Sequence, residues 1–156
     1  MKVSVLTSLL LLIILSAVSY GQGERITETK LGLSKVVDMT FDQALAKVKA
    51  ELKNEGFGIL TEVDVKATMK KKLDIDYRPY HILGACNPPL AHKALQAEEQ
   101  IGLMLPCKVI VYVNENEKTV VAVVDPVRMM DDVENKDLGE VAKTVQEKFI
   151  KVLKSI

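Results

Sequence analysis

Residues 107–113 (CKVIVYV) and 119–124 (TVVAVV) are two valine-rich runs separated by the polar stretch 114–118 (NENEK). Apolar runs of this length joined by a short polar connection are typical of a β-hairpin. Apolar residues occupy both parities of each run, so we expect both strands to be central in a sheet and covered on both faces. Asp125-Pro126 follows directly and predicts the end of the sheet, because proline cannot donate to a strand ladder.

The segment before this hairpin alternates between strand and helix patterns. We expect strands at 34–39, 57–63 and 80–85, and a first helix that begins at Thr40, where Thr40 and Gln43 fit a capping box. Glycine tolerates the left-handed conformation common at helix ends, so Gly56 predicts the end of that helix. Apolar residues recur at helical spacing in this helix and in a last helix at 137–153, and predict their buried faces: Phe41, Leu45, Val48 and Leu52 in the first, and Leu138, Val141, Ala142, Val145, Phe149 and Val152 in the last.

Two shorter helices are expected in between. Asp64 can cap one in which Val65, Met69 and Leu73 share a face, with Lys70, Lys71 and Lys72 on the solvated side. Asn87 before Pro88-Pro89 predicts the start of the other. Strands and helices mix without strict alternation, which favours an α+β fold: a single small domain with a central, mostly antiparallel sheet and helices packed on it.

The N-terminus has the pattern of a cleavable secretion signal. Lys2 precedes a 14-residue apolar run from Val5 to Val18, and small residues follow it up to Gly21. A membrane span needs about 20 apolar residues, so a stable anchor is disfavoured. We therefore expect residues 1–21 to be a signal peptide, 22–33 a flexible lead-in and 34–156 the domain, exported to the periplasm or the cell exterior.

The charge balance argues against a nucleic-acid partner. The chain has 21 Lys and Arg residues and 21 Asp and Glu residues, so no net field attracts a polyanion. Its 48% hydrophobic content excludes intrinsic disorder, because there is enough apolar surface to offset the entropy of folding.

The loop Gly84-Ala85-Cys86-Asn87-Pro88 is the strongest candidate site. It places the Cys86 thiol directly before a predicted helix, whose partial positive charge would favour a thiolate and make Cys86 a candidate nucleophile. Gly84 permits close approach of a backbone or a ligand. The alternative is that Cys86 packs as a small hydrophobic residue at a strand end.

Cys107 is the second of the two cysteines and lies 21 positions after Cys86. Two cysteines in an exported chain favour a disulfide. It would stabilise the fold by about 3 kcal/mol, because it lowers the entropy of the unfolded chain. Sequence alone does not place their Cα atoms within bonding range. The spacing fits neither a CxxC redox motif nor a zinc ribbon.

No cofactor is assigned by the sequence. His81 and Cys86 have opposite strand parity, which disfavours a shared metal, and His92 turns away from the apolar side of its helix. A haem or metal bound by His92, a cysteine or a methionine stays an open alternative, although a C-x-x-C-H attachment signature is absent. Common hydrolase, metalloprotease and nucleotide-binding motifs are absent too.

Several motifs in order resemble the domain-of-unknown-function 302 family over about Val36 to Ile156. They are residues 56–64 (GFGILTEVD), 78–80 (RPY), 82–88 (ILGACNP), 91–92 (AH), 101–103 (IGL), 105–107 (LPC), and 125–126 (DP) with Met129. The resemblance implies a compact α+β domain, often dimeric, without an established activity. It also implies that one site comprises the motif residues Cys86, Asn87, Pro88, His92 and Cys107. His81 and Lys108 depart from the family pattern, which has Arg or Lys and Asn at these positions.

These observations leave three functions open. The leading hypothesis is a non-enzymatic module, homodimeric, that binds an unknown small ligand or handles thiols at the Gly84–Pro88 loop. The second is an enzyme that uses the Cys86 thiolate as nucleophile or redox centre, and the third a structural or dimerisation domain without a small-molecule site. Because relatives also occur without a signal, any Cys86–Cys107 disulfide is expected to be conditional.

Overall fold

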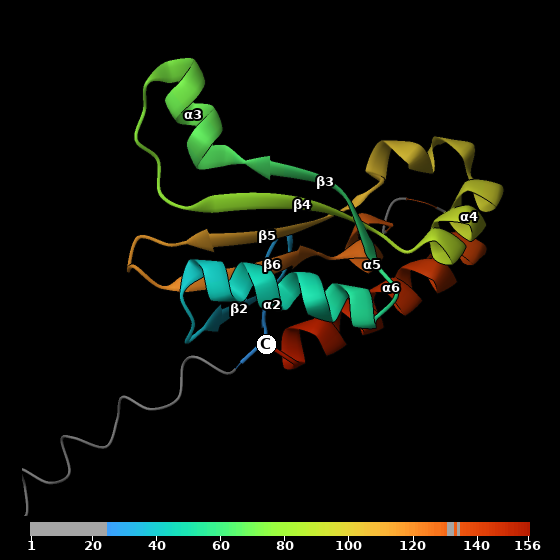
Figure 1. The fold of residues 1–156 in the computed structure, drawn as a ribbon. Coiled ribbons are helices and arrows are strands. Elements are labelled where there is room, and N and C mark those ends of the chain that lie inside the picture. Colours follow the sequence, from blue (N-terminus) through green and yellow to red (C-terminus); the bar gives the residue numbers. More distant parts are fainter. Residues whose placement is uncertain (1–24, 131–132, 134) are drawn as a thin grey trace, which may run out of the picture.

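The structure is a computed structural model that describes residues 25–130, 133 and 135–156. The predicted signal peptide, residues 1–21, and the first part of the lead-in lie outside the described residues. A single six-stranded antiparallel sheet forms the centre of the domain, with the strand order β1-β2-β6-β5-β4-β3. Helices pack on the sheet and at one of its ends (Figure 1). The predicted α+β class is confirmed.

The valine-rich hairpin forms as predicted and is central in the sheet. Its strands are β5 (Cys107–Val113) and β6 (Thr119–Val124), with Val109 opposite Val123 and Val111 opposite Val121. β6 pairs with β2 (Gly32–Val37), and β5 pairs with β4 (Tyr80–Cys86). The Asp125-Pro126 pair ends the sheet, as expected from the missing proline donor.

Only one face of this hairpin is covered by helices. Val109, Val111, Val121 and Val123 are buried in the main core, together with side chains of α2 and α6. On the opposite face Ile110, Tyr112 and Ala122 are only half-buried. The prediction that both faces are covered is therefore wrong. Val120 on this second face is buried, whereas Ile110, Tyr112 and Ala122 form a partly open surface, where Tyr112 stacks on Tyr80 at 5.3 Å between ring centroids.

The two main helices lie on the covered face because their apolar stripes point to it. α2 (Phe41–Asn54) begins with the predicted Thr40 capping box and buries Ala44, Val48 and Leu52, while Phe41 and Leu45 are partly buried. α6 (Lys136–Lys154) buries most of its predicted stripe, with Val141 partly buried. Phe149 of α6 stacks on Phe57, with ring centroids 4.9 Å apart. The buried side chain of Lys35 caps the C-terminus of α6: its Nζ donates to the Leu153 carbonyl at 3.1 Å.

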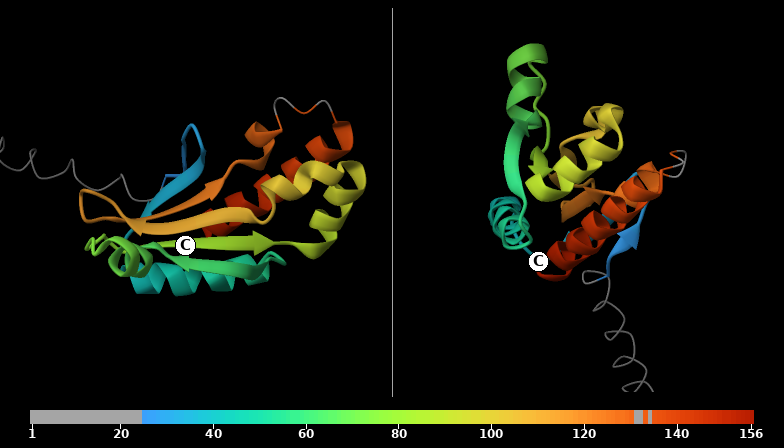
Figure 2. Two further views of the ribbon diagram at one scale, coloured as in Figure 1. Left: turned by 90° about the horizontal axis from the view of Figure 1, so that it is seen from above. Right: turned by 90° about the vertical axis from the view of Figure 1, so that its right-hand side faces the viewer.

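The helix after Asp64 does not pack as expected. α3 (Val65–Leu73) is capped by Asp64, as predicted, but none of its residues is buried, and Leu73 is 61% exposed. In Figure 2 (right) α3 stands apart from α2 and α6. It extends from β3 (Gly58–Asp64), the outermost strand, which has a β-bulge between Ile59 and Thr61. The period-four pattern predicted the helix correctly, but its contacts are with β3 and β4, which leave Val65 and Met69 half-buried and Leu73 exposed.

Short elements complete the chain. β1 (Thr27–Glu28) falls in the predicted lead-in, and β2 begins at Gly32, two residues before the expected strand. α4 (Pro88–Ala97) is followed by the 3-10 helix η1 (Glu99–Met104), and α5 (Pro126–Met129) follows the sheet. Among the described residues, no helix is both long enough and apolar enough to cross a membrane.

Gly84 has a packing role that can be tested. A Cβ atom at this position would collide with Oγ1 of Thr61 and lie 2.6 Å from Cγ of Pro106. We expect Gly84→Ala to lower the free energy of unfolding by about 1–3 kcal/mol, the usual cost of overpacking, in urea denaturation. Gly102→Ala is the control, because an added Cβ there meets no atom within 4 Å. Equal stability of the two variants would contradict this role.

Candidate functional site

The Gly84–Pro88 loop is held in place by Asn87. Its Oδ1 accepts from the backbone N–H of Leu90 at 3.3 Å and so caps α4. Its Nδ2 donates at 3.4 Å to the Glu55 carbonyl at the end of α2. Lys148 of α6 donates to the same carbonyl at 3.0 Å. Asn87 therefore uses both ends of its amide to join the loop to the helical layer.

The first three residues of α4 offer no free backbone donor to the Cys86 sulfur. Pro88 and Pro89 have no N–H, Leu90 donates to Asn87 Oδ1, and the N–H of Ala91 donates to the Asn87 carbonyl at 2.9 Å. Of the four N–H positions that a helix N-terminus leaves without a helical partner, those of residues 88–90 are thus absent or used, and Ala91 makes the first helical hydrogen bond. Burial raises the pKa of the Cys86 thiol above its ordinary value. The thiolate stabilisation predicted from the sequence is thus opposed by desolvation.

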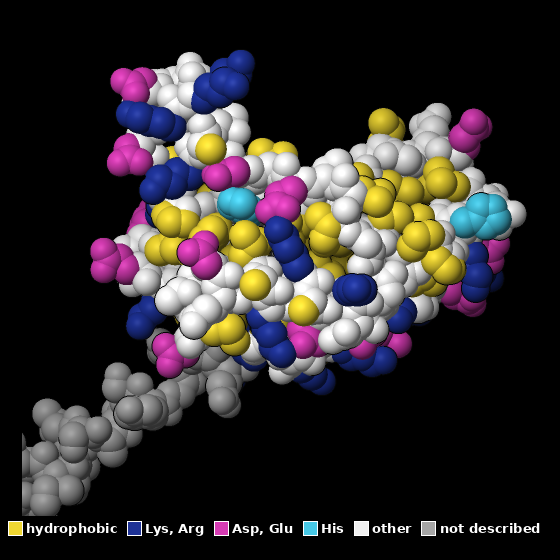
Figure 3. Space-filling view, in the orientation of Figure 1, with side chains coloured by type: hydrophobic (Ala, Val, Ile, Leu, Met, Phe, Trp, Pro, Cys, Tyr) yellow, Lys and Arg dark blue, Asp and Glu magenta, His cyan; other side chains and the backbone are white. Residues whose placement is uncertain are grey.

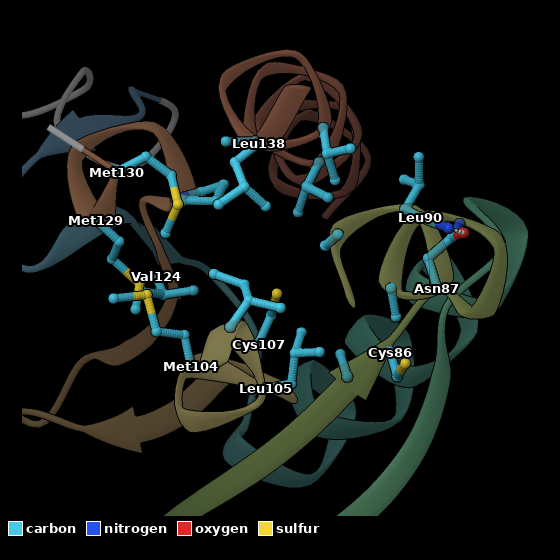
Figure 4. A pocket seen from close by; sticks show the side chains of 18 of the residues that line it. Cys86, Asn87, Leu90, Met104, Leu105, Cys107, Val124, Met129, Met130 and Leu138 are labelled. Carbon is cyan, nitrogen blue, oxygen red and sulfur yellow. Dashed lines mark hydrogen bonds between the residues drawn. The ribbon is translucent and has the colours of Figure 1, made fainter. Parts of the chain in front are cut away.

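Cys107 begins β5 next to this loop. Its register partner on β4 is Ala85, the residue before Cys86. The side chains of Cys86 and Cys107 therefore point to opposite faces of the sheet. Burial raises the pKa of Cys107, the neighbouring Cys86 charge raises it further, and Lys108 acts in the opposite direction. Both thiols are free, and Figure 4 shows their sulfur atoms pointing in different directions. The conditional disulfide stays a prediction.

An apolar pocket lies beside these residues, where the main core meets a smaller cluster built on Ala94, Ile101 and Leu138. We call it the methionine pocket, because Met104, Met129 and Met130 form one of its walls (Figure 4). It encloses about 70 Å³. Its remaining lining is Phe57, Ala85, Cys86, Asn87, Leu90, Ala91, Ala94, Ile101, Leu105, Cys107, Val124, Pro126, Leu138, Val141, Ala142 and Val145. Figure 3 shows hydrophobic side chains gathering on the surface over the α4 end of the molecule.

The pocket brings together only part of the predicted site. Cys86, Asn87 and Cys107 border it, but Pro88 and His92 are exposed and do not. The reason is helical geometry: His92 lies two positions from Leu90, which faces the pocket, and is therefore turned to solvent. The three methionines were missed by the sequence analysis, since two lie in the short α5 and its C-cap and one ends η1, where no periodic pattern marks a buried side.

His81 lies in a separate polar cluster at the far end of β4. Its Nδ1 is 2.9 Å from Glu62 Oε1 and its Nε2 is 3.5 Å from Asp64 Oδ2. A hydrogen bond from Lys49 is the largest cause that lowers the pKa of Glu62, and a backbone hydrogen bond from Ala67 does the same for Asp64. Within the part of the chain that the structure describes, no three His, Cys, Asp or Glu side chains are grouped to hold a metal.

Comparisons with known proteins agree with this fold. A crystal structure titled as an uncharacterized conserved protein DUF302 from Bacillus stearothermophilus is similar, with a TM-score of 0.75 and 26% identity over 81% of this chain and 98% of the other. A comparison with curated proteins finds no match. The family model described as "Domain of unknown function DUF302" matches residues 33–156. Because this match covers the whole sheet from β2 onward and all of its helices, the chain belongs to the DUF302 family.

Proposed function

We propose that this domain is a non-enzymatic binding module that holds a small, uncharged, apolar ligand in the methionine pocket. The observation that carries the proposal is the chemistry of the pocket wall, which consists almost entirely of carbon and sulfur. Among the described residues that line it, Asn87 alone has an amide side chain, and both ends of that amide are engaged with the backbone. A charged or strongly hydrogen-bonding ligand would lose its hydration there without compensation.

The methionines make the pocket adaptable. Its 70 Å³ is well below the roughly 150 Å³ of an engineered cavity that binds benzene. Methionine has an unbranched side chain with three rotatable bonds and repacks at low cost. Met104 and Met130 lie in half-buried positions beside loops, so their movement can enlarge the pocket without disturbing the sheet.

The methyl groups of the methionines provide a direct assay. We expect xenon to enter the pocket as it is, and benzene to enter with displacement of the methionine wall. Both should shift the ¹³C-methyl NMR signals of Met104, Met129 and Met130. Met39 and Met69 are internal controls in the same spectrum, because neither lines the pocket. Equal shifts at all five methyl groups would indicate non-specific association and contradict the proposal.

A filled pocket should lose this response. Ala91→Leu adds three carbon atoms to the pocket wall, and Gln96→Leu places the same side chain on the exposed side of α4. We expect Ala91→Leu to abolish the benzene-induced shifts and Gln96→Leu to leave them unchanged. Loss in both variants, or in neither, would place benzene elsewhere.

The enzymatic alternative makes an opposite prediction about thiol reactivity. Because burial raises both pKa values, a smaller thiolate fraction is present at neutral pH than in free cysteine. The variants Cys107→Ala and Cys86→Ala each keep one thiol. In each, we expect the rate of alkylation by iodoacetamide to rise with pH, with an apparent pKa above about 8.5. Cys107 should react more slowly than Cys86, since it is the more deeply buried. An apparent pKa below that of free cysteine at Cys86 would favour the enzyme.

Export and dimerisation accompany this proposal as predictions. Export rests on the N-terminal sequence pattern, and a homodimer on the family resemblance. Neither is needed for the pocket, which is built from one chain.

A further inference from the structure

A groove lies over the half-buried face of the sheet. We call it the open-face groove. It has a volume of about 690 Å³. Its floor comprises Lys108, Ile110 and Tyr112 of β5 with Ala122 and Val124 of β6, the β1–β2 turn from Thr29 to Gly32 forms one wall, and α5 closes one end with Arg128 and Met129.

The floor is apolar along most of its length. Ile110 and Ala122 are register partners, so they lie side by side, and the small Ala122 side chain deepens the groove at its middle. Tyr112 closes the far end, held in its orientation by the stack on Tyr80. An aliphatic or aromatic body can therefore lie on Ile110 and Ala122 with one end against a tyrosine ring.

Cations gather at the opposite end. Lys30, Lys108 and Arg128 all line the groove. Glu28 is 3.8 Å from Arg128, but in the described residues no carboxylate lies within 4.0 Å of the Lys30 or Lys108 ammonium group. Asp125 also lines the groove, but it is buried and its Oδ1 accepts from the backbone N–H of Val127 and from Nε2 of Gln146, so it makes no ion pair with Lys30 or Lys108.

The distance between the two ends defines a ligand length. Every second residue of β5 points to this face, namely Lys108, Ile110 and Tyr112. Lys108 and Tyr112 are four residues apart, so at about 3.3 Å per residue the cationic end and the tyrosine are separated by about 13 Å. The groove thus combines an extended apolar floor with positive charge at one end only.

We propose that the open-face groove binds a medium-chain aliphatic carboxylate, with its head group at Lys30 and Lys108 and its chain over Ile110 and Ala122. The charge complementarity selects the anion, and the apolar floor selects the chain. This site is distinct from the methionine pocket: the two share only Val124 and Met129, and the ligand proposed here is charged.

Octanoate is the probe, with 1-octanol as its uncharged counterpart. In amide NMR titrations of the protein, we expect saturable shifts at Lys108, Ile110 and Ala122 with octanoate, and much weaker binding of octanol. Affinity should fall with added salt, because the head-group contacts are exposed. Lys108→Gln should weaken octanoate binding about threefold to fivefold, the range of an exposed ion pair. Lys118→Gln, in the hairpin tip outside the groove, should leave it unchanged.

Filling the floor tests the position of the chain. We expect Ala122→Leu to remove octanoate binding while its amide spectrum stays that of a folded protein; if Ala122→Leu does not fold, the Lys108→Gln result decides. Octanoate shifts confined to Met104 and Met130, which line the methionine pocket but not the groove, would overturn the groove proposal and leave the methionine pocket supported. Equal binding by wild type and Lys108→Gln, or an open face occupied by a second copy of the chain, would also overturn it.

Discussion

The rest of the structure depends on the burial of one face of the β5–β6 hairpin. Val109, Val111, Val121 and Val123 form a continuous apolar strip under α2 and α6, and Phe149 completes it against Phe57. Both helices pack on this face, so Ile110, Tyr112 and Ala122 on the other face are only half-buried. The length of α6 has a second effect. In its first turns Leu138 packs in the small cluster with Ala94 of α4 and Ile101 of η1, and Val141 contacts both this cluster and the main core. The methionine pocket lies at this transition, between a core organised by strands and a smaller core organised by short helices.

The chemistry of the Gly84–Pro88 loop is governed by the two prolines after Asn87. A helix that begins Asn-Leu or Asn-Ala would present donors to the preceding thiol, whereas Pro88 and Pro89 present none. The loop therefore resembles a strut more than a catalytic turn: Asn87 connects three elements, and Gly84 allows Thr61 and Pro106 to close around the strand. A thiol in such surroundings contributes a soft, weakly polar surface, which agrees with the rest of the pocket wall.

The sequence predicted those features that depend on local or periodic signals. The hairpin, the Thr40, Asp64 and Asn87 caps, the left-handed Gly56 and the buried stripe of α6 all have such signals and are confirmed. Two expectations were wrong because they required knowledge of partners. Apolar residues occur at both parities of β5 and β6, and this pattern does not show which face the helices cover. The apolar stripe of α3 likewise does not show that only the neighbouring strands β3 and β4 contact it. The candidate site was half predicted: Cys86, Asn87 and Cys107 follow from motif and cap chemistry. Met104 comes from η1, and Met129 and Met130 come from α5 and its C-cap; neither segment is periodic, and only the tertiary fold brings them together.

The two edge strands of the sheet, β1 and β3, determine how readily copies of the chain associate at high concentration. An unpaired strand edge invites another chain to add to it, and proteins avoid this with short, bent or charged outer strands. At one edge β1 has only two residues, too few to serve as a template. At the other, β3 carries the bulge at Leu60, and its last residues include the charged side chains of Glu62 and Asp64, which contact Lys49 and His81. A second copy that aligned here would meet a bent backbone flanked by charged side chains. Large apolar side chains are nevertheless exposed on β3 itself, at Leu60 and Val63, so growth into a fibre is opposed there by the bulge and the charged neighbours, and at the other edge by the shortness of β1.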